Sequence, residues 1–93
     1  MTAELRKYID NNRQRFLEEL FAFLRIPSIS TLPERQADVY KAAGFVAESL
    51  QAVGMENVEL IRNGGHPLVY AEWLHAPGKP TVLCYGHYDV QPP

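Results

Sequence analysis

The stretch that decides the fold is TVLCYGHYDVQPP, residues Thr81–Pro93. It begins with TVLCY, a run too apolar to alternate, which predicts an interior strand covered on both faces. Gly86 follows and lets the backbone turn or approach another group closely. An imidazole, His87, and a carboxylate, Asp89, come directly afterwards. The pattern therefore predicts a buried strand that delivers both groups to its carboxyl end, the edge where open α/β sheets bind ligands.

His87 and Asp89 are two residues apart, so an extended backbone would point both side chains the same way. A neutral imidazole binds zinc through one ring nitrogen and donates its other N–H to a carboxylate, which fixes the tautomer. His87 is therefore a candidate metal ligand, and Asp89 is its candidate hydrogen-bonding partner. On spacing alone, the pair also fits a surface hydrogen bond without a metal, which is the commoner arrangement.

Two amphipathic helices are predicted upstream of this stretch. Apolar residues recur at three- and four-residue spacing over residues 3–24, and Pro27 ends that helix by pushing its predecessor out of helical geometry. A second helix is predicted from about residue 31 to Val53, with Gly54 as its C-terminal cap. Both apolar stripes are interpreted as core packing.

A β-hairpin is predicted next, because VELI and PLVYAEWL flank the turn signal Asn63-Gly64-Gly65. The fold class is therefore α/β: two helices, a hairpin and then a buried strand. An interior strand needs neighbours on both edges and cover on both faces, and these residues supply no element for one face. The pattern favours the beginning of a larger α/β protein, and a free-standing α+β domain is the alternative.

Composition excludes several function classes. The 93 residues are 46% hydrophobic and 22% charged, which is typical of a globular chain. A net charge of −2 with no basic run argues against a nucleic-acid surface. No apolar leader or membrane-length segment occurs, so we expect no membrane partner. The single cysteine, Cys84, lies in the apolar run and is expected to be a buried, inert thiol in a cytoplasmic protein.

The remaining polar candidates have simpler interpretations. His66 lies between Gly65 and Pro67 and is expected to be a turn residue, and His75 is expected to be a solvated strand end before Ala76-Pro77-Gly78. Neither histidine has ligand spacing, so neither is expected to join a metal site. Ser28 and Ser30 lie in a loop with no base at a recognisable spacing, so a serine hydrolase is not supported.

Three stretches carry a family resemblance. VLCYGHYDVQPP resembles the first metal-ligand motif of the M20 metallopeptidases, Gly-His-x-Asp followed by a short apolar residue and proline. Its form YGHYDVQP is similar to the dipeptidase and carnosinase-like branch. FAFLRIPSIS resembles the family's helix end and its IPSxS loop, and GGHPLVYAEW resembles the hairpin before the metal strand. The similarity extends from about Tyr8 to Pro93.

The resemblance implies a zinc-peptidase-like α/β catalytic domain with a separate lid domain that is often used for homodimerisation. It implies a site for two divalent metal ions, zinc with manganese or cobalt as alternatives. His87 would bind one metal, and Asp89 would be the active-site residue that orients it. The family's other ligands and its general base come later than these motifs. Residues 1–93 are therefore expected to be the N-terminal portion of the catalytic domain, inactive alone.

The expected activity of the parent enzyme is metal-dependent hydrolysis of dipeptides or short peptides. Within the same family, an N-acyl amino acid amidohydrolase is the alternative. From a different class, the chain could be a non-catalytic packing or assembly module in which His87 and Asp89 form a hydrogen-bonded pair only.

Overall fold

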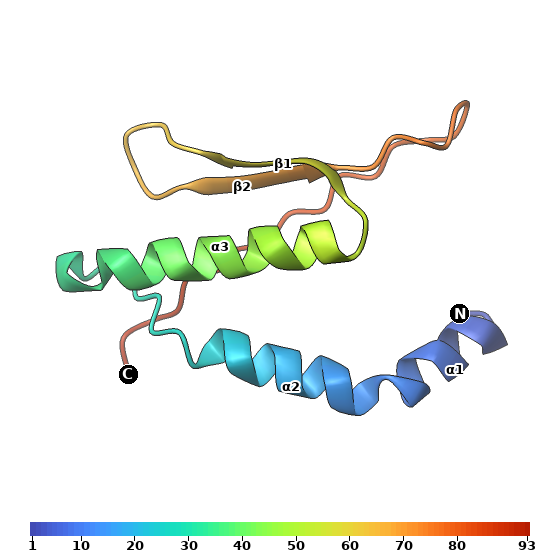
Figure 1. The fold of residues 1–93 in the computed structure, drawn as a ribbon, viewed down its shortest axis with the longest axis horizontal. Coiled ribbons are helices and arrows are strands. Elements are labelled where there is room, and N and C mark those ends of the chain that lie inside the picture. The colour runs from blue at the N-terminus through green and yellow to red at the C-terminus, as the bar shows by residue number, and fades with distance from the viewer.

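Three α-helices, one 3-10 turn and a two-stranded sheet make up the fold in a computed structural model that describes residues 1–93. The elements in chain order are α1 (Ala3–Asn11), α2 (Arg13–Leu24), η1 (Pro33–Arg35), α3 (Gln36–Ala52), β1 (Glu56–Ile61) and β2 (Leu68–Glu72). The hairpin lies on one side of α3, and α1 and α2 lie on the other (Figure 1). None of the helices has the length and apolar character needed to cross a bilayer.

The single helix predicted over residues 3–24 is instead two helices that meet at Asn12. The Asn12 side chain donates a hydrogen bond from Nδ2 to the Tyr8 carbonyl oxygen at 2.8 Å, and its backbone leaves helical geometry at φ −112° and ψ 8°. Asparagine side chains compete with the helical backbone for such hydrogen bonds, which explains the break. The prediction of one continuous helix was therefore wrong at this residue.

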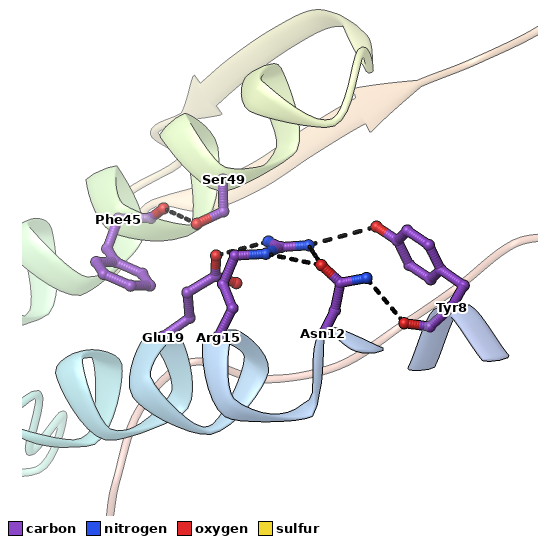
Figure 2. A network of polar contacts seen from close by, with 6 residues as sticks. All are labelled: Tyr8, Asn12, Arg15, Glu19, Phe45 and Ser49. Carbon is purple, nitrogen blue, oxygen red and sulfur yellow. Dashed lines mark hydrogen bonds and ion pairs between the residues drawn. The ribbon is translucent and has the colours of Figure 1, made fainter. Parts of the chain in front are cut away.

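Arg15 reinforces the junction between α1 and α2. Its guanidinium donates to Asn12 Oδ1 at 3.3 Å, to the Tyr8 hydroxyl at 3.3 Å and to Glu19 Oε1 at 2.8 Å (Figure 2). The side chains of Arg15 and Glu19 are about half exposed, so solvent screens the ion pair and it stabilises the fold little. The network orients the helix junction more than it stabilises it.

The second predicted helix is confirmed as η1 followed by α3. One face of α3 contacts both strands of the hairpin, and its residues Val39, Ala42 and Ala43 are completely buried. On the other side, Phe45 contacts Phe23 of α2, with ring centroids 5.4 Å apart. The helix thus joins the two layers.

Gly54 ends α3 as predicted, in the left-handed conformation with φ 94°. A Cβ there meets no atom within 4 Å, so replacement by alanine costs backbone strain and no clash. We expect Gly54→Ala to lower the free energy of unfolding by roughly 1–2 kcal/mol. Gly44, inside α3, is the matched control, because its added Cβ also meets nothing. Gly44→Ala should instead stabilise by up to about 1 kcal/mol, and urea unfolding of the full-length protein measures both.

The predicted hairpin is confirmed. β1 and β2 pair antiparallel, with Leu60 opposite Val69 and Ile61 opposite Leu68. An irregularity between Glu56 and Glu59 contains Asn57, whose φ is 51°. Gly64 in the turn has φ 79°, a conformation that explains the Asn-Gly-Gly sequence.

The predicted interior strand over residues 81–85 is not formed. These residues have no ladder partner, and Val82, Leu83 and Tyr85 are 81%, 91% and 93% exposed. Cys84 is exposed as well, so the expectation of a buried thiol was also wrong. The reason is that no other segment of these 93 residues pairs with either edge or covers either face, so the apolar run has nothing to pack against.

Only seven residues are buried, and they lie in the linker after α2, on α3 and at the end of the hairpin turn: Ile26, Ser28, Ile29, Val39, Ala42, Ala43 and Pro67. The accessible surface is 7675 Å², against about 5500 Å² for a compact protein of this mass. The radius of gyration is 15.6 Å, against about 12 Å for a compact domain of this length. The fold is more open than a self-contained domain.

Candidate active site

The end of the chain lies against the linker that joins α2 to η1. Val90 donates its backbone N–H to the Ser28 carbonyl oxygen at 3.0 Å, and Ile29 and Val90 form a parallel bridge. Ser28, which is 1% exposed, donates its hydroxyl to the Tyr88 carbonyl oxygen at 3.0 Å. The position of the His-x-Asp segment is therefore set by residues about sixty positions earlier in the chain.

Tyr88 provides a second attachment, to the end of the hairpin turn. Its hydroxyl donates to the carbonyl oxygen of the buried Pro67 at 2.5 Å. Burial, with a smaller contribution from the nearby Asp89 charge, raises the pKa of Tyr88 above its usual value. The phenol therefore stays protonated and keeps donating at neutral pH.

His87 and Asp89 contact each other, as the alternation of side chains predicted. His87 Nδ1 lies 2.9 Å from Asp89 Oδ1, and the side chains are 78% and 35% exposed. A carboxylate can only accept, so Nδ1 carries the hydrogen and Nε2 of the neutral ring keeps its lone pair. The arrangement leaves an oriented imidazole with one free, solvent-facing nitrogen.

Asp89 is held on its other oxygen by Ser30. Ser30 Oγ donates to Asp89 Oδ2 at 2.6 Å. The Ser30 hydrogen bond, and to a lesser degree that of His87, lowers the pKa of Asp89 below its usual value despite partial burial, which acts the other way. The carboxylate is therefore ionised at neutral pH and accepts from both neighbours.

Ser30 is a residue that sequence reasoning missed, because it was weighed only as a nucleophile. Its hydroxyl donates to a carboxylate, that of Asp89, and not to an imidazole. The only sequence signal that could have found it is the IPSxS resemblance, which places it in a family loop without giving it a role.

The other two histidines do not join the pair. His66, in the hairpin turn as expected, donates from Nε2 to the Ser30 carbonyl oxygen at 2.9 Å. His75 lies 2.8 Å from Glu56 at the other end of the hairpin, next to Trp73. No three His, Cys, Asp or Glu side chains come close enough together to hold a metal ion. The pair of His87 and Asp89 therefore offers one atom that could bind a metal ion, His87 Nε2, on a ring that Asp89 holds in the Nδ1–H tautomer.

Comparisons with known proteins find similarity to proteins named as dipeptidases. No family model matches the chain. The Cys-Gly metallodipeptidase DUG1 of Candida albicans is 31% identical over 96 residues, which cover 90% of this chain and 20% of that protein. The Beta-Ala-His dipeptidase of Rattus norvegicus is 29% identical over 101 residues, or 96% of this chain and 20% of that protein.

A solved structure agrees with the sequence comparisons. The structure of the di-peptidase Dug1p from Saccharomyces cerevisiae matches with a TM-score of 0.85 at 28% identity, over 92% of this chain and 20% of that chain. The chain thus spans about a fifth of the length of the relatives that it matches. The likeness confirms the expected fold class, a part of a zinc-peptidase-like catalytic domain.

Proposed function

Because this chain belongs to the M20 family of metallopeptidases, we propose that the protein containing it hydrolyses dipeptides or short peptides in a metal-dependent reaction. The observation that carries the proposal is the oriented imidazole of His87, with Nδ1 held by Asp89 and Nε2 free. The relatives named as dipeptidases support the choice of substrate class.

His87 is the proposed metal ligand. A neutral imidazole with its second N–H donated to a carboxylate is the usual state of a zinc-binding histidine. The 78% exposure of its side chain leaves Nε2 open to an ion and to ligands from elsewhere in the protein. Two divalent ions, zinc or alternatively manganese or cobalt, would supply Lewis-acid activation of a water molecule and of the scissile carbonyl.

Asp89 is the proposed orienting residue. Its carboxylate keeps the hydrogen of His87 on Nδ1 and fixes the plane of the ring, because the two atoms are 2.9 Å apart. Accepting that hydrogen also raises the basicity of Nε2. Asp89 thus acts on the reaction through His87.

Residues 1–93 are proposed to be part of a catalytic domain whose other parts supply the remaining ligands and the general base. The large accessible surface and the exposed apolar residues 82, 83 and 85 support this, because a larger sheet would cover them. We expect these residues alone to be inactive, since one ligand position does not hold a catalytic zinc. Dimerisation through a separate lid domain belongs to the same proposal.

An N-acyl amino acid amidohydrolase would use the same metals and the same His87, so only the substrate separates it from a dipeptidase. A non-catalytic module would use neither. The test is an assay of the full-length protein after chelation and dialysis, with zinc or manganese restored, on Cys-Gly, β-Ala-His and an N-acetyl amino acid.

Dipeptide hydrolysis that vanishes on chelation and returns with metal is the expected result. Cleavage of the acetylated substrate alone would replace the dipeptidase by the amidohydrolase. A folded protein with no hydrolysis of any of them at restored metal would overturn the enzymatic proposal.

A further inference from the structure

We propose that Ser30 is a positioning residue for this site, because it fixes the Asp89 carboxylate that in turn fixes the imidazole of His87. The inference rests on the proposed function for its consequence, metal binding at His87, and on the geometry of these side chains for its premise. No role was assigned to Ser30 by sequence reasoning.

The two oxygens of Asp89 have separate partners. Oδ2 accepts from Ser30 Oγ at 2.6 Å, and Oδ1 lies 2.9 Å from His87 Nδ1. The torsion that rotates a carboxylate is broad and soft, so a single contact to an exposed ring leaves the carboxylate plane poorly defined. A second, charge-assisted hydrogen bond from a half-buried loop restricts that rotation. Ser30 therefore sets the direction in which Asp89 presents Oδ1.

Ser30 is itself held in place. Its neighbour Ile29 is buried and forms a β-bridge with Val90. The carbonyl oxygen of Ser30 itself accepts a hydrogen bond from His66 Nε2 at 2.9 Å. The linker after α2, the hairpin turn and the end of the chain therefore converge on this residue. A serine whose backbone is held by these contacts is a suitable support for a carboxylate on an exposed segment.

A merely structural role for Ser30 makes different predictions. If its hydrogen bond served only to attach the end of the chain, its loss would lower stability without changing the tautomer or the metal affinity of His87. Two hydrogen bonds with Ser28 already attach the end of the chain to the linker: the Ser28 hydroxyl donates to the Tyr88 carbonyl oxygen, and the Val90 N–H donates to the Ser28 carbonyl oxygen. The Ser30 hydroxyl is distinct because it contacts the side chain of Asp89.

The experiment compares Ser30→Ala and Ser30→Thr in the full-length protein. Ser49→Ala is the matched control, because its hydroxyl bonds only to the Phe45 carbonyl oxygen on an exposed part of α3. Zinc affinity is measured by competition with a chromophoric chelator, well below the unfolding temperature of each variant. The tautomer of His87 is measured in the metal-free protein from its ring nitrogen chemical shifts.

Ser30→Ala should weaken zinc binding about 10-fold, the effect of losing a partner beyond the metal ligands, and should mix the two tautomers of His87. Ser30→Thr, which keeps the hydroxyl, should restore both properties, and Ser49→Ala should match the wild type. Wild-type affinity and tautomer in Ser30→Ala would overturn the inference, as would equal loss in Ser30→Ala and Ser30→Thr.

Failure of the proposed function gives a different result. A wild-type protein that binds no zinc at His87 would refute the metal site, and the tautomer measurement would still judge Ser30. In that case, an Nδ1–H tautomer that depends on the Ser30 hydroxyl supports its positioning of Asp89, and one that does not depend on it refutes this.

Discussion

Replacing His87 by alanine is expected to lower the zinc affinity of the full-length protein by more than about 10-fold and to abolish dipeptide hydrolysis. Losing a partner beyond the metal ligands already costs about 10–100-fold, so losing a ligand should cost at least as much. Stability should change little, because the imidazole is 78% exposed and its only hydrogen bond is to Asp89. Chelator competition, an activity assay and thermal unfolding measure the three quantities.

His75→Ala is the matched control for this substitution. His75 is also exposed and also hydrogen-bonded to a carboxylate, Glu56, at 2.8 Å, but it lies at the other end of the hairpin. It should leave zinc affinity and activity unchanged. Equal effects of the two substitutions, or no effect of His87→Ala, would favour the non-catalytic module.

Replacing Asp89 by alanine should have the second largest effect, a loss of about 10–100-fold in zinc affinity. The ring of His87 would lose the acceptor that keeps hydrogen on Nδ1, and Ser30 would lose its partner. Asp89→Asn should fall between the wild type and Asp89→Ala, because an amide oxygen can still accept but carries no charge.

The same chelator competition ranks the three proteins. An Asp89→Ala variant that binds zinc as tightly as the wild type would contradict the orienting role, whatever its activity. A variant with normal zinc affinity and lost activity would instead assign Asp89 to the reaction itself.

Much of the fold followed from local sequence signals. The hairpin was predictable because Asn63-Gly64-Gly65 requires a turn, and Gly64 adopts φ 79° there. The end of α3 was predictable because glycine is favoured in the left-handed conformation that Gly54 adopts. The break at Asn12 was not, because a helical stripe continues through it and one side-chain hydrogen bond decides the geometry.

The run TVLCY shows the limit of local reasoning in the other direction. Its apolar composition predicts a covered strand, but strand formation requires partners, and these 93 residues supply none. Val82 and Leu83 are thus exposed because no other segment covers them. The apolar pattern predicts only that such residues favour a covered strand when partner strands are present.

The candidate site divides in the same way. His87 and Asp89 could be paired from sequence because strand alternation acts over two residues. Ser30 could not, because its hydrogen bond to Asp89 spans 59 positions and depends on the packing of Ile29 against the end of the chain. The sequence therefore predicted the pair of His87 and Asp89 but not the residue that holds Asp89 in place, Ser30.

The most direct test of the metal site is anomalous diffraction at the zinc edge from crystals of the full-length protein loaded with zinc. The account predicts an anomalous peak about 2.0–2.1 Å from His87 Nε2, with Nδ1 still hydrogen-bonded to Asp89. Zinc density elsewhere with none at this ring, or zinc bound through Nδ1, would contradict it.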